Sequence, residues 1–436
     1  MVHVTAKQGS ASVYGNVAAA ASVAPGTLAH ASQGQQCRPS GIHSRFCNHG
    51  KDVNYDIYNL SSSGESLTKY GDLLDEVFVL YEMPRLTTVA AGAAAPAGFP
   101  YKLDNVANVA TLYQSGHIGK DQVEAIDQGG LTHGYSRKAE YVLLKNARFS
   151  IGSHQVTETS GQLEIFKQKC FKEMGEGQRD FMRFSDKRST GDHLRILPLD
   201  LWGNQVHKTA IVLSAAAFTQ FRISLSFNAL ESAVWKKSGD YDVYASAAQP
   251  TVFLGSVQSY LPPQFAEKLR TQEFHELITQ TTVYSEKISI PAAGGSHRFD
   301  HLPLNTVQSL GAAVVLDATA FECSTLLPSG RSPIAKIQVR INALEHANTH
   351  GEVQQYLSSK MGYLKTPDSG MMIIPFAEHA ENESAGGLSA SNVDRLVVDL
   401  TLQGDGFAED ATVFLIYFGL NTLWYSNNVA NLGYAS

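Results

Sequence analysis

The feature that most constrains the fold is a series of short apolar blocks, rich in Val, Ile, Phe, Tyr and Thr, that recur along most of the chain. Within these blocks the apolar residues alternate or come in brief runs, which is the pattern of β-strands. Clusters such as "PAAGGS" and "AENESAGGLSASN" separate the blocks and are typical of turns. The clearest blocks cover residues 75–83, 139–152, 209–228, 242–261, 275–290, 334–343, 370–378, 394–403 and 411–420.

Helical patterns are few and short. Parallel sheets need a helix after nearly every strand, so this scarcity favours antiparallel sandwiches and an all-β fold class. A chain of 436 residues exceeds what one core usually supports, so two consecutive sandwiches are expected. Three helices are predicted, at 161–174, 262–273 and 350–364. The first has an apolar stripe of Leu163, Phe166, Cys170 and Met174, which is typical of a surface helix. The second begins at Pro262 and Pro263, which suit a helix start.

Composition and charge exclude several classes of protein. Charged residues make up only 17% of the chain, so neighbouring molecules are expected to cover much of its surface. The net charge is -7 and the basic residues are dispersed, which argues against direct nucleic-acid binding. Four scattered cysteines fit a reducing compartment. The stretch "NVAAAASVAPGTLAHA" lacks the Leu-rich core of a secretory signal, so we expect a flexible arm there.

The closing stretch, "ATVFLIYFGLNTLWYSNNVANLGYAS", holds ten apolar or small residues in a row, followed by aromatic residues and an asparagine-rich tail. Its apolar run stops at Asn421, too short to span a membrane as a helix. We therefore interpret Val413 to Leu420 as the last strand, buried on both faces. Trp424 and Tyr425 are expected to plug its end, with the tail to Tyr434 packing back on the chain or meeting a neighbour.

Candidate chemical sites are weak. The chain contains no G-x-S-x-G, H-E-x-x-H, Walker or C-x-x-C motif. Two clusters resemble metal ligands, but their spacing and context favour ordinary loops, and the acidic group before the first strand favours a charged turn. We therefore predict no catalytic, cofactor-binding or metal-binding residue. The clusters are Cys37, His43, Cys47 and His49; His297, Asp300 and His301; and Asp72, Asp75 and Glu76.

Two sequons and three tryptophans complete the candidates. Asn59 and Asn382 could accept glycans if the chain meets a glycosylation machinery. Trp202, Trp235 and Trp424 could form a sugar-stacking platform, although core or interface packing is the preferred interpretation.

Several segments in the first half resemble the first jelly roll of the major capsid proteins of nucleocytoplasmic large DNA viruses. They are "KNARFSIGSHQVTETSGQLEIFKQK" (145–169), "LRILPLDLW" (194–202) and "AAAFTQFRISLSFN" (215–228). The matching positions are Ile151, Gly152, Gln155, Val156 and Glu158 on the first segment, Leu197, Pro198 and Trp202 on the second, and Phe218, Arg222 and Ile223 on the third.

The resemblance continues in the second half and covers residues 72–436. "VFLGSVQSYLPPQFAEKLRTQEFHELITQ" (252–280) resembles the family's connecting helix and its entry to the second roll. Segments 334–364 and 373–402 and the ending "NVANLGYAS" are similar to later family motifs. The matching positions are His275, Glu276, Leu277 and Ile278 at the entry, and Pro375, Phe376, Ala377, Gly386, Ser389, Asn392 and Asp394 in the later segment.

This resemblance implies a double jelly roll and a structural role. The expected parts are an N-terminal arm (1–48), a first jelly roll (49–262), a connecting helix (263–274) and a second jelly roll (275–436). Trimers would form pseudo-hexagonal capsomers that tile an icosahedral shell, in a virion assembled in the host cytoplasm. Implied partners are further copies, neighbouring capsomers, minor capsid or penton proteins and, through the arm, an internal membrane. Inserts at 84–138 and 291–333 are expected to include surface loops.

Two other classes of function stay open from the residues alone. A carbohydrate-binding jelly-roll module predicts convergent aromatic side chains and a monomer or small oligomer. A cupin-like metalloenzyme predicts bound iron or zinc.

Overall fold

The structure of the chain is a computed structural model that describes residues 65–66, 71–127, 131–170, 194–202, 210–259, 261, 263–301, 306–361, 370–377, 387–389, 392–406 and 408–433. The expected arm, the two sequons and the cluster at Cys37 to His49 lie outside these residues.

The strands that follow residue 273 form a regular two-sheet sandwich, which we call the second roll. Numbered in chain order from β15 to β22, its eight strands pair as 1-8-3-6 in one sheet and 2-7-4-5 in the other. Two antiparallel sheets interleaved in this way make a jelly roll. Sheet III contains β15 (Phe274–Ile290), β22 (Glu409–Ser426), β17 (Thr306–Leu316) and β20 (Met372–Pro375), with β23 (Val429–Leu432) beside β22; sheet IV contains β16 (Gly295–Asp300), β21 (Leu396–Leu402), β18 (Ile334–Ile341) and β19 (Leu344–His350).

The strands before residue 260 form the first roll, which is also built from two antiparallel sheets. No strand of either roll pairs with a strand of the other among the described residues. Sheet I contains β14 (Thr251–Ser259), β2 (Leu73–Glu82), and, on the other side of β2, β9 (Leu194–Leu199) and β10 (Ile211–Val212). Sheet II contains β1 (Glu65–Ser66), β11 (Phe221–Phe227), β7 (Leu144–Ile151) and β8 (His154–Thr159).

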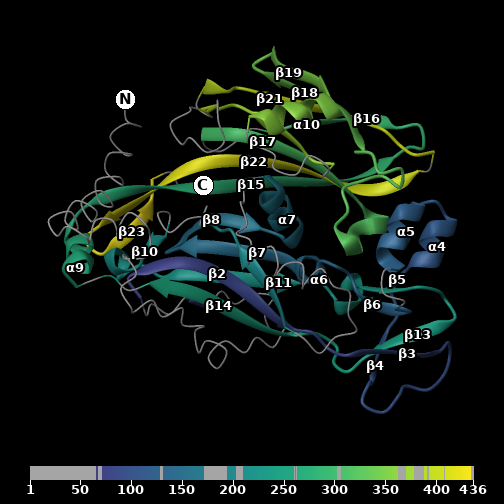
Figure 1. Cartoon of the computed structure of the whole chain (residues 1–436). Coiled ribbons are helices and arrows are strands. Elements are labelled where there is room, and N and C mark those ends of the chain that lie inside the picture. The colour runs from purple at the N-terminus through teal and green to yellow at the C-terminus, as the bar shows by residue number, and fades with distance from the viewer. Residues whose placement is uncertain are drawn as a thin grey trace.

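An insert between β2 and β7 extends the first roll at one end. Its strands pair with a second excursion between β11 and β14 to give two small sheets, and two short helices lie beside them (Figure 1). The expected insert at 291–333, by contrast, contains two strands of the second roll itself, β16 and β17, as well as loops. The small sheets are β3 (Leu86–Ala90), β13 (Tyr241–Ala245) and β4 (Tyr101–Leu103), and β5 (Ala107–Asn108), β12 (Val234–Lys236) and β6 (His133–Tyr135); the helices are α4 (Val109–Gln114) and α5 (Lys120–Asp127).

Most predicted strands form, and three of the predicted blocks are interrupted, of which the block 242–261 is divided into β13 and β14. Residues 139–143 of the block 139–152 are helix α6, and the block 209–228 is divided by the short helix η2 (Ser214–Ala216). Every residue of α6 is buried, so its apolar pattern could not separate strand from helix. The remaining helices are α6 (Ala139–Leu143), η3 (Leu230–Ala233), α7 (Gly161–Cys170), α9 (Pro263–Thr271), η4 (Asp317–Glu322) and α10 (Gly351–Lys360).

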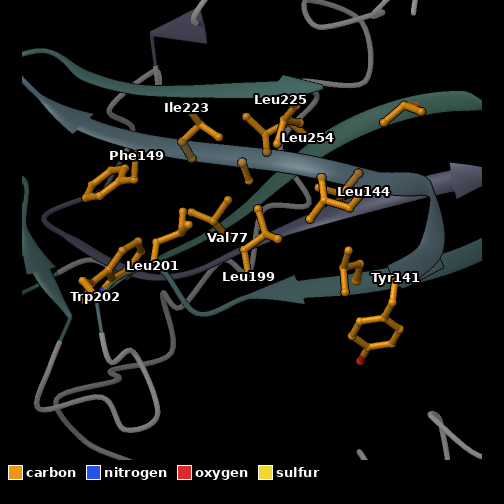
Figure 2. Packing of buried hydrophobic residues seen from close by; sticks show 14 of the residues in the cluster. Val77, Tyr141, Leu144, Phe149, Leu199, Leu201, Trp202, Ile223, Leu225 and Leu254 are labelled. Carbon is orange, nitrogen blue, oxygen red and sulfur yellow. The ribbon is translucent and has the colours of Figure 1, made fainter. Parts of the chain in front are cut away.

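The four large sheets stack as layers in the order I, II, III, IV (Figure 1). One core lies between sheets I and II, where Val77, Leu199 and Leu254 face Phe149 and Ile223 (Figure 2). A second core lies between sheets III and IV. Within the described part of the chain, no helix is long and apolar enough to cross a membrane.

Candidate functional site

Helix α7 lies at the contact between the rolls, which is the junction of sheets II and III. Leu163 and Phe166 pack on the outer face of sheet III, where the Phe166 ring meets Phe414 edge-on at 6.0 Å. Ile165 belongs to the first-roll core. The prediction of a surface helix is therefore wrong, because residues 163–167 of α7 are buried between two layers.

Polar side chains on α7 are satisfied inside this junction. Glu164 accepts hydrogen bonds from the Thr159 hydroxyl at 2.5 Å and from the Asp200 amide at 3.0 Å. Lys167 donates to the Asp200 carbonyl and lies 3.5 Å from Glu164. Burial raises the pKa of the Glu164 carboxyl, and the Lys167 charge opposes that shift. The network fixes α7 to the end of β9, which sets where Phe166 meets the second roll.

A second link between the rolls is made by Tyr425 on β22. Its hydroxyl accepts from the Val212 amide of the first roll at 3.2 Å and donates to Glu276 at 3.1 Å. Burial raises the pKa of Glu276 to about 8. The Tyr425 ring stacks on Phe274 at 4.6 Å. Tyr425 is thus buried near the end of the last strand, although that strand runs on to Ser426 rather than stopping at Leu420 as expected.

Trp424 does not plug that end. Its side chain is 41% exposed and stacks on the ring of His275 at 5.8 Å. Successive side chains of a strand point to opposite faces, so Tyr425 and Trp424 cannot both turn inward. Trp202 and Trp235 are buried, so the three tryptophans form no shared platform.

The third link joins the insert of the first roll to β22. His117 Nδ1 lies 2.9 Å from Glu409 Oε1. Burial raises the pKa of the Glu409 carboxyl, and His117 opposes that shift. Together with α7 and Tyr425, this pair holds the two rolls in one fixed relation.

Between these links the junction leaves a cleft of about 1110 Å³, lined by both polar and apolar side chains. On the side of sheet II the cleft is lined by Arg148, Glu158 and Ser224, and on the side of sheet III by Thr281 and Thr412. Arg148 Nε donates to Glu158 at 3.1 Å. The outer face of sheet II is therefore polar where it lines this cleft.

The outer face of sheet IV is also polar. Asp399 on β21 lies 3.8 Å from Arg298 on β16 and pairs with Arg340 on β18. At the end of the same sheet Arg395 donates twice to Asp300.

The outer face of sheet I has the opposite character. Val77, Val79 and Tyr81 of β2 point into the core, so Phe78 and Leu80 point away from it. Leu80 pairs in register with Phe253 of β14 and Ile196 of β9, and Phe78 pairs with Gly255 and Pro198. Leu80, Phe253, Ile196 and Pro198 are all half-buried. Apolar side chains thus cover three neighbouring strands on this outer face.

The remaining residues that were considered as chemical sites have structural roles. Asp72 accepts from the Leu261 amide at 2.9 Å and lies 3.5 Å from Arg270, so it ties β2 to helix α9. His297 and Asp300 lie on strand β16 rather than in the expected loop, because alternate residues of this segment, including Phe299, enter the core. His301 stacks on Tyr284 at 4.4 Å.

Among the described residues, no three His, Cys, Asp or Glu side chains come together as a metal site. Among the residues that build the junction, Glu164 and Lys167 were not singled out from the sequence, and Tyr425 was expected only to plug the end of the last strand. Charged residues on a predicted surface helix look like a solvated face, so no local signal marks Glu164 or Lys167 as buried.

Comparison with known proteins gives structural matches only. No family profile and no curated protein matches the chain. VP54 of PBCV-1 superposes with a TM-score of 0.62 at 13% identity, covering 86% of this chain and 92% of that one. The Faustovirus major capsid protein gives a TM-score of 0.56 at 10% identity, covering 86% and 88%. A chain from the Sputnik virophage structure gives 0.53 at 11% identity, covering 85% of each chain.

These matches agree with the strand order derived above. The fold is a double jelly roll, shared with viral major capsid proteins along most of both chains. The fold expected from the sequence resemblance is confirmed.

Proposed function

We propose that this double jelly-roll protein is the major capsid protein of a large DNA virus and assembles as trimeric, pseudo-hexagonal capsomers of an icosahedral shell. The observation that carries the proposal is the match to VP54 of PBCV-1 over 86% of this chain and 92% of that one. A match that spans both rolls and their connection supports a shared architecture better than a match to one sandwich would.

The junction between the rolls supports the same role. Three copies of a subunit with two similar rolls present six similar units, which suits a hexagonal lattice. This arrangement requires a fixed relation between the rolls, and α7, Tyr425 and the His117–Glu409 pair supply it. The low charge content fits a subunit whose sides are covered by neighbours.

The finer features are part of the proposal. The first roll would extend over 49–262 and the second over 275–436, joined by a connecting helix at 263–274. The arm, 1–48, would reach an internal membrane or a minor capsid protein, with penton proteins as further partners. The protein would act without enzymatic activity, cofactor or direct nucleic-acid contact, in virions assembled in the host cytoplasm. Asn59 and Asn382 would carry any glycans.

Light scattering on the purified full-length protein tests the trimer. The expected mass is three times the 47.2 kDa of one chain, and negative-stain images should show hexagonal outlines. A strictly monomeric protein at high concentration would contradict the proposal. Selective binding on a glycan array would favour the carbohydrate-binding alternative, and stoichiometric iron or zinc would favour the metalloenzyme.

Deletion of residues 1–48 tests the arm in the same system. Particles that assemble and recruit membrane normally without it would contradict its proposed role. Intact-mass measurement of protein from infected cells, before and after replacing Asn59 and Asn382 by Gln, tests glycan attachment.

A further inference from the structure

Three ionisable side chains lie together where helix α7 meets the end of strand β9. They are Glu164 and Lys167 on α7 and Asp200, which directly follows β9. All three residues are more than nine-tenths buried. A buried lysine beside two carboxyl groups can do more than form an ion pair, because an amine and a carboxylic acid can condense to an amide.

The amine of Lys167 is held at the main chain of Asp200. Its Nζ donates to the Asp200 carbonyl oxygen and lies 3.5 Å from Glu164 Oε1. Only Cα and Cβ separate the Asp200 carboxyl carbon from that carbonyl carbon, so rotation about χ1 brings the carboxyl within reach of Nζ. Burial raises the pKa of Glu164, and the Asp200 charge adds to that shift, so the Asp200 carboxyl lies near the same cluster.

Glu164 is placed to carry a proton between the two reacting groups. The Thr159 hydroxyl and the Asp200 amide donate to its carboxyl at 2.5 and 3.0 Å, which fixes the carboxyl beside Lys167. A carboxyl whose pKa is raised takes up a proton more readily than an exposed one. Glu164 can therefore accept a proton from Lys167 and pass it to Asp200.

The dry surroundings of the cluster favour condensation. In water a lysine and an aspartate are an ammonium and a carboxylate, which do not react with each other. Burial disfavours both charged forms and so favours the neutral amine and the protonated acid. Leu199 and Leu201, on either side of Asp200, are buried in the first-roll core. Holding the reacting groups in contact corresponds to an effective concentration of about 10⁵ M or more.

We propose that Lys167 and Asp200 form an intramolecular isopeptide bond. Lys167 Nζ, as the neutral amine, attacks the Asp200 carboxyl carbon. A C–N bond forms, one carboxyl C–O bond breaks, and the oxygen leaves as water. Glu164 takes the proton from the nitrogen and delivers it to the leaving oxygen, so Glu164 ends in the protonation state in which it began. The ion pair is thereby converted to one amide and one water, with no oxidant or other co-reactant.

This bond would tie α7 covalently to the end of β9. Helix α7 carries Leu163 and Phe166 to sheet III, so the bond would hold the contact between the rolls in place. Such a crosslink needs no oxidation of cysteine, which suits a chain whose four cysteines fit a reducing compartment. The inference does not depend on the proposed function.

Intact-mass measurement of the denatured full-length protein tests the bond. The expected mass is lower than that of the sequence by one water. Trypsin does not cleave after an acylated lysine, so digestion should give a branched peptide that joins residues 149–169 to residues 196–208. Lys287 lies 3.3 Å from Asp317 on the exposed surface and should stay unmodified in the same digest.

Four variants assign the roles of the residues. Lys167→Met removes the amine and Glu164→Gln removes the proton carrier, so both proteins should keep the full mass of their sequence. Asp200→Asn should form the same amide by losing ammonia, so its linked mass should equal that of linked wild type. Lys287→Met is the matched control and should lose one water as wild type does. Circular dichroism establishes that each variant is folded.

Other outcomes overturn the inference separately from the proposed function. Folded wild-type protein with the full sequence mass and an unmodified Lys167 would reject the bond, whatever the variants do. A branch point at Glu164 would reject Asp200 as the partner. Loss of water that persists in Glu164→Gln would reject the role of Glu164. Each of these results leaves the capsid proposal intact, whereas a linked but strictly monomeric protein would reject only the capsid proposal.

Discussion

The two rolls reach similar sandwiches by different means. In the second roll, the eight strands β15 to β22 follow one another into two sheets, and the core between them is apolar. The first roll is interrupted by the insert after β2, and ion pairs lie inside it. Arg195 and Glu140 are fully buried and 2.8 Å apart, and Arg195 also donates to the carbonyls of Ser136 and Arg137.

The difference between the rolls lies in how the sequence determines the pairing of their strands. In the second roll, alternating apolar residues suffice to define the strands, because register is set wherever one face of a strand is buried. The strand β9 lies far along the chain from the preceding strand, β8. The pairing register of such a strand is better determined if it carries a buried charge that can meet its partner in one register only. We therefore expect the first roll to depend on individual polar contacts and the second roll to depend on packing.

The largest effect should come from breaking the buried pair in the first roll. Arg195→Met leaves Glu140 charged in the core, which should lower the free energy of unfolding by about 3 to 5 kcal/mol. The matched change in the second roll, Arg340→Met, removes a partly exposed partner of Asp399 and should cost less than about 1 kcal/mol. Urea denaturation measures both.

Equal losses for the two arginine variants would contradict the proposed difference between the rolls. The double variant Glu140→Gln with Arg195→Met serves as the control. It removes the Glu140 charge from the core, so it should recover part of the stability lost in Arg195→Met.

The next effect concerns the contact between the rolls. Phe166→Ala removes the ring that packs on Phe414 and should cost about 3 to 5 kcal/mol in a cooperative unfolding transition. Phe218→Ala, at an exposed ring, should change stability by less than about 0.5 kcal/mol. Calorimetry that resolves two separate transitions only in Phe166→Ala would show that α7 couples the rolls. An unchanged thermogram would show that it does not.

A pH-dependent effect should follow from Glu276. Its folded pKa of about 8 lies above the unfolded value, so the folded state binds the proton more tightly. This contribution is fully present below the unfolded pKa and is lost as pH rises through 8, by about 1.4 kcal/mol between pH 7 and pH 9. Glu276→Gln should remove this part of the pH dependence in denaturation curves. An identical pH profile in the variant would assign the loss to other groups.

The smallest expected change in stability concerns the left-handed backbone of one turn in the second roll. The turn between β18 and β19 holds Asn342 at φ 50° and Ala343 at φ 70°. Alanine is disfavoured in this left-handed region, so Ala343→Gly should stabilise the protein by about 1 kcal/mol. A rise in thermal midpoint confirms the expectation, and a fall would mean that the Ala343 side chain contributes contacts that outweigh the backbone cost.

The sequence predicted the regular parts of the fold well. The blocks 275–290, 334–343, 394–403 and 411–420 all became strands, since each alternates or is apolar throughout. The last strand is buried on both faces, as expected, and runs on to Ser426. The end was misjudged because Thr422 to Ser426 mix polar and aromatic residues, and their pairing with β15 and β23 overrides that local pattern.

The sequence said much less about which side chains are buried between the layers and which point outward. Family resemblance indicated the architecture, but no pattern showed that Glu164 and Lys167 are buried or that Phe78 and Leu80 point outward. Which side of a strand faces the core depends on the neighbouring layer, and a single strand as apolar as β2 does not reveal it.

The β22–β23 hairpin contacts the first roll, and this contact has a consequence for synthesis on the ribosome. The Thr219 hydroxyl accepts from the Ala430 amide at 2.8 Å, and the Phe218 amide donates to the Asn428 carbonyl at 3.0 Å, across more than two hundred residues of sequence. Nascent chains fold from the N-terminus as they emerge, yet these two hydrogen bonds cannot form until residue 430 has left the exit tunnel. Prematurely terminated chains would lack these hydrogen bonds between the rolls. Such chains would therefore be less stable and more exposed to proteolysis.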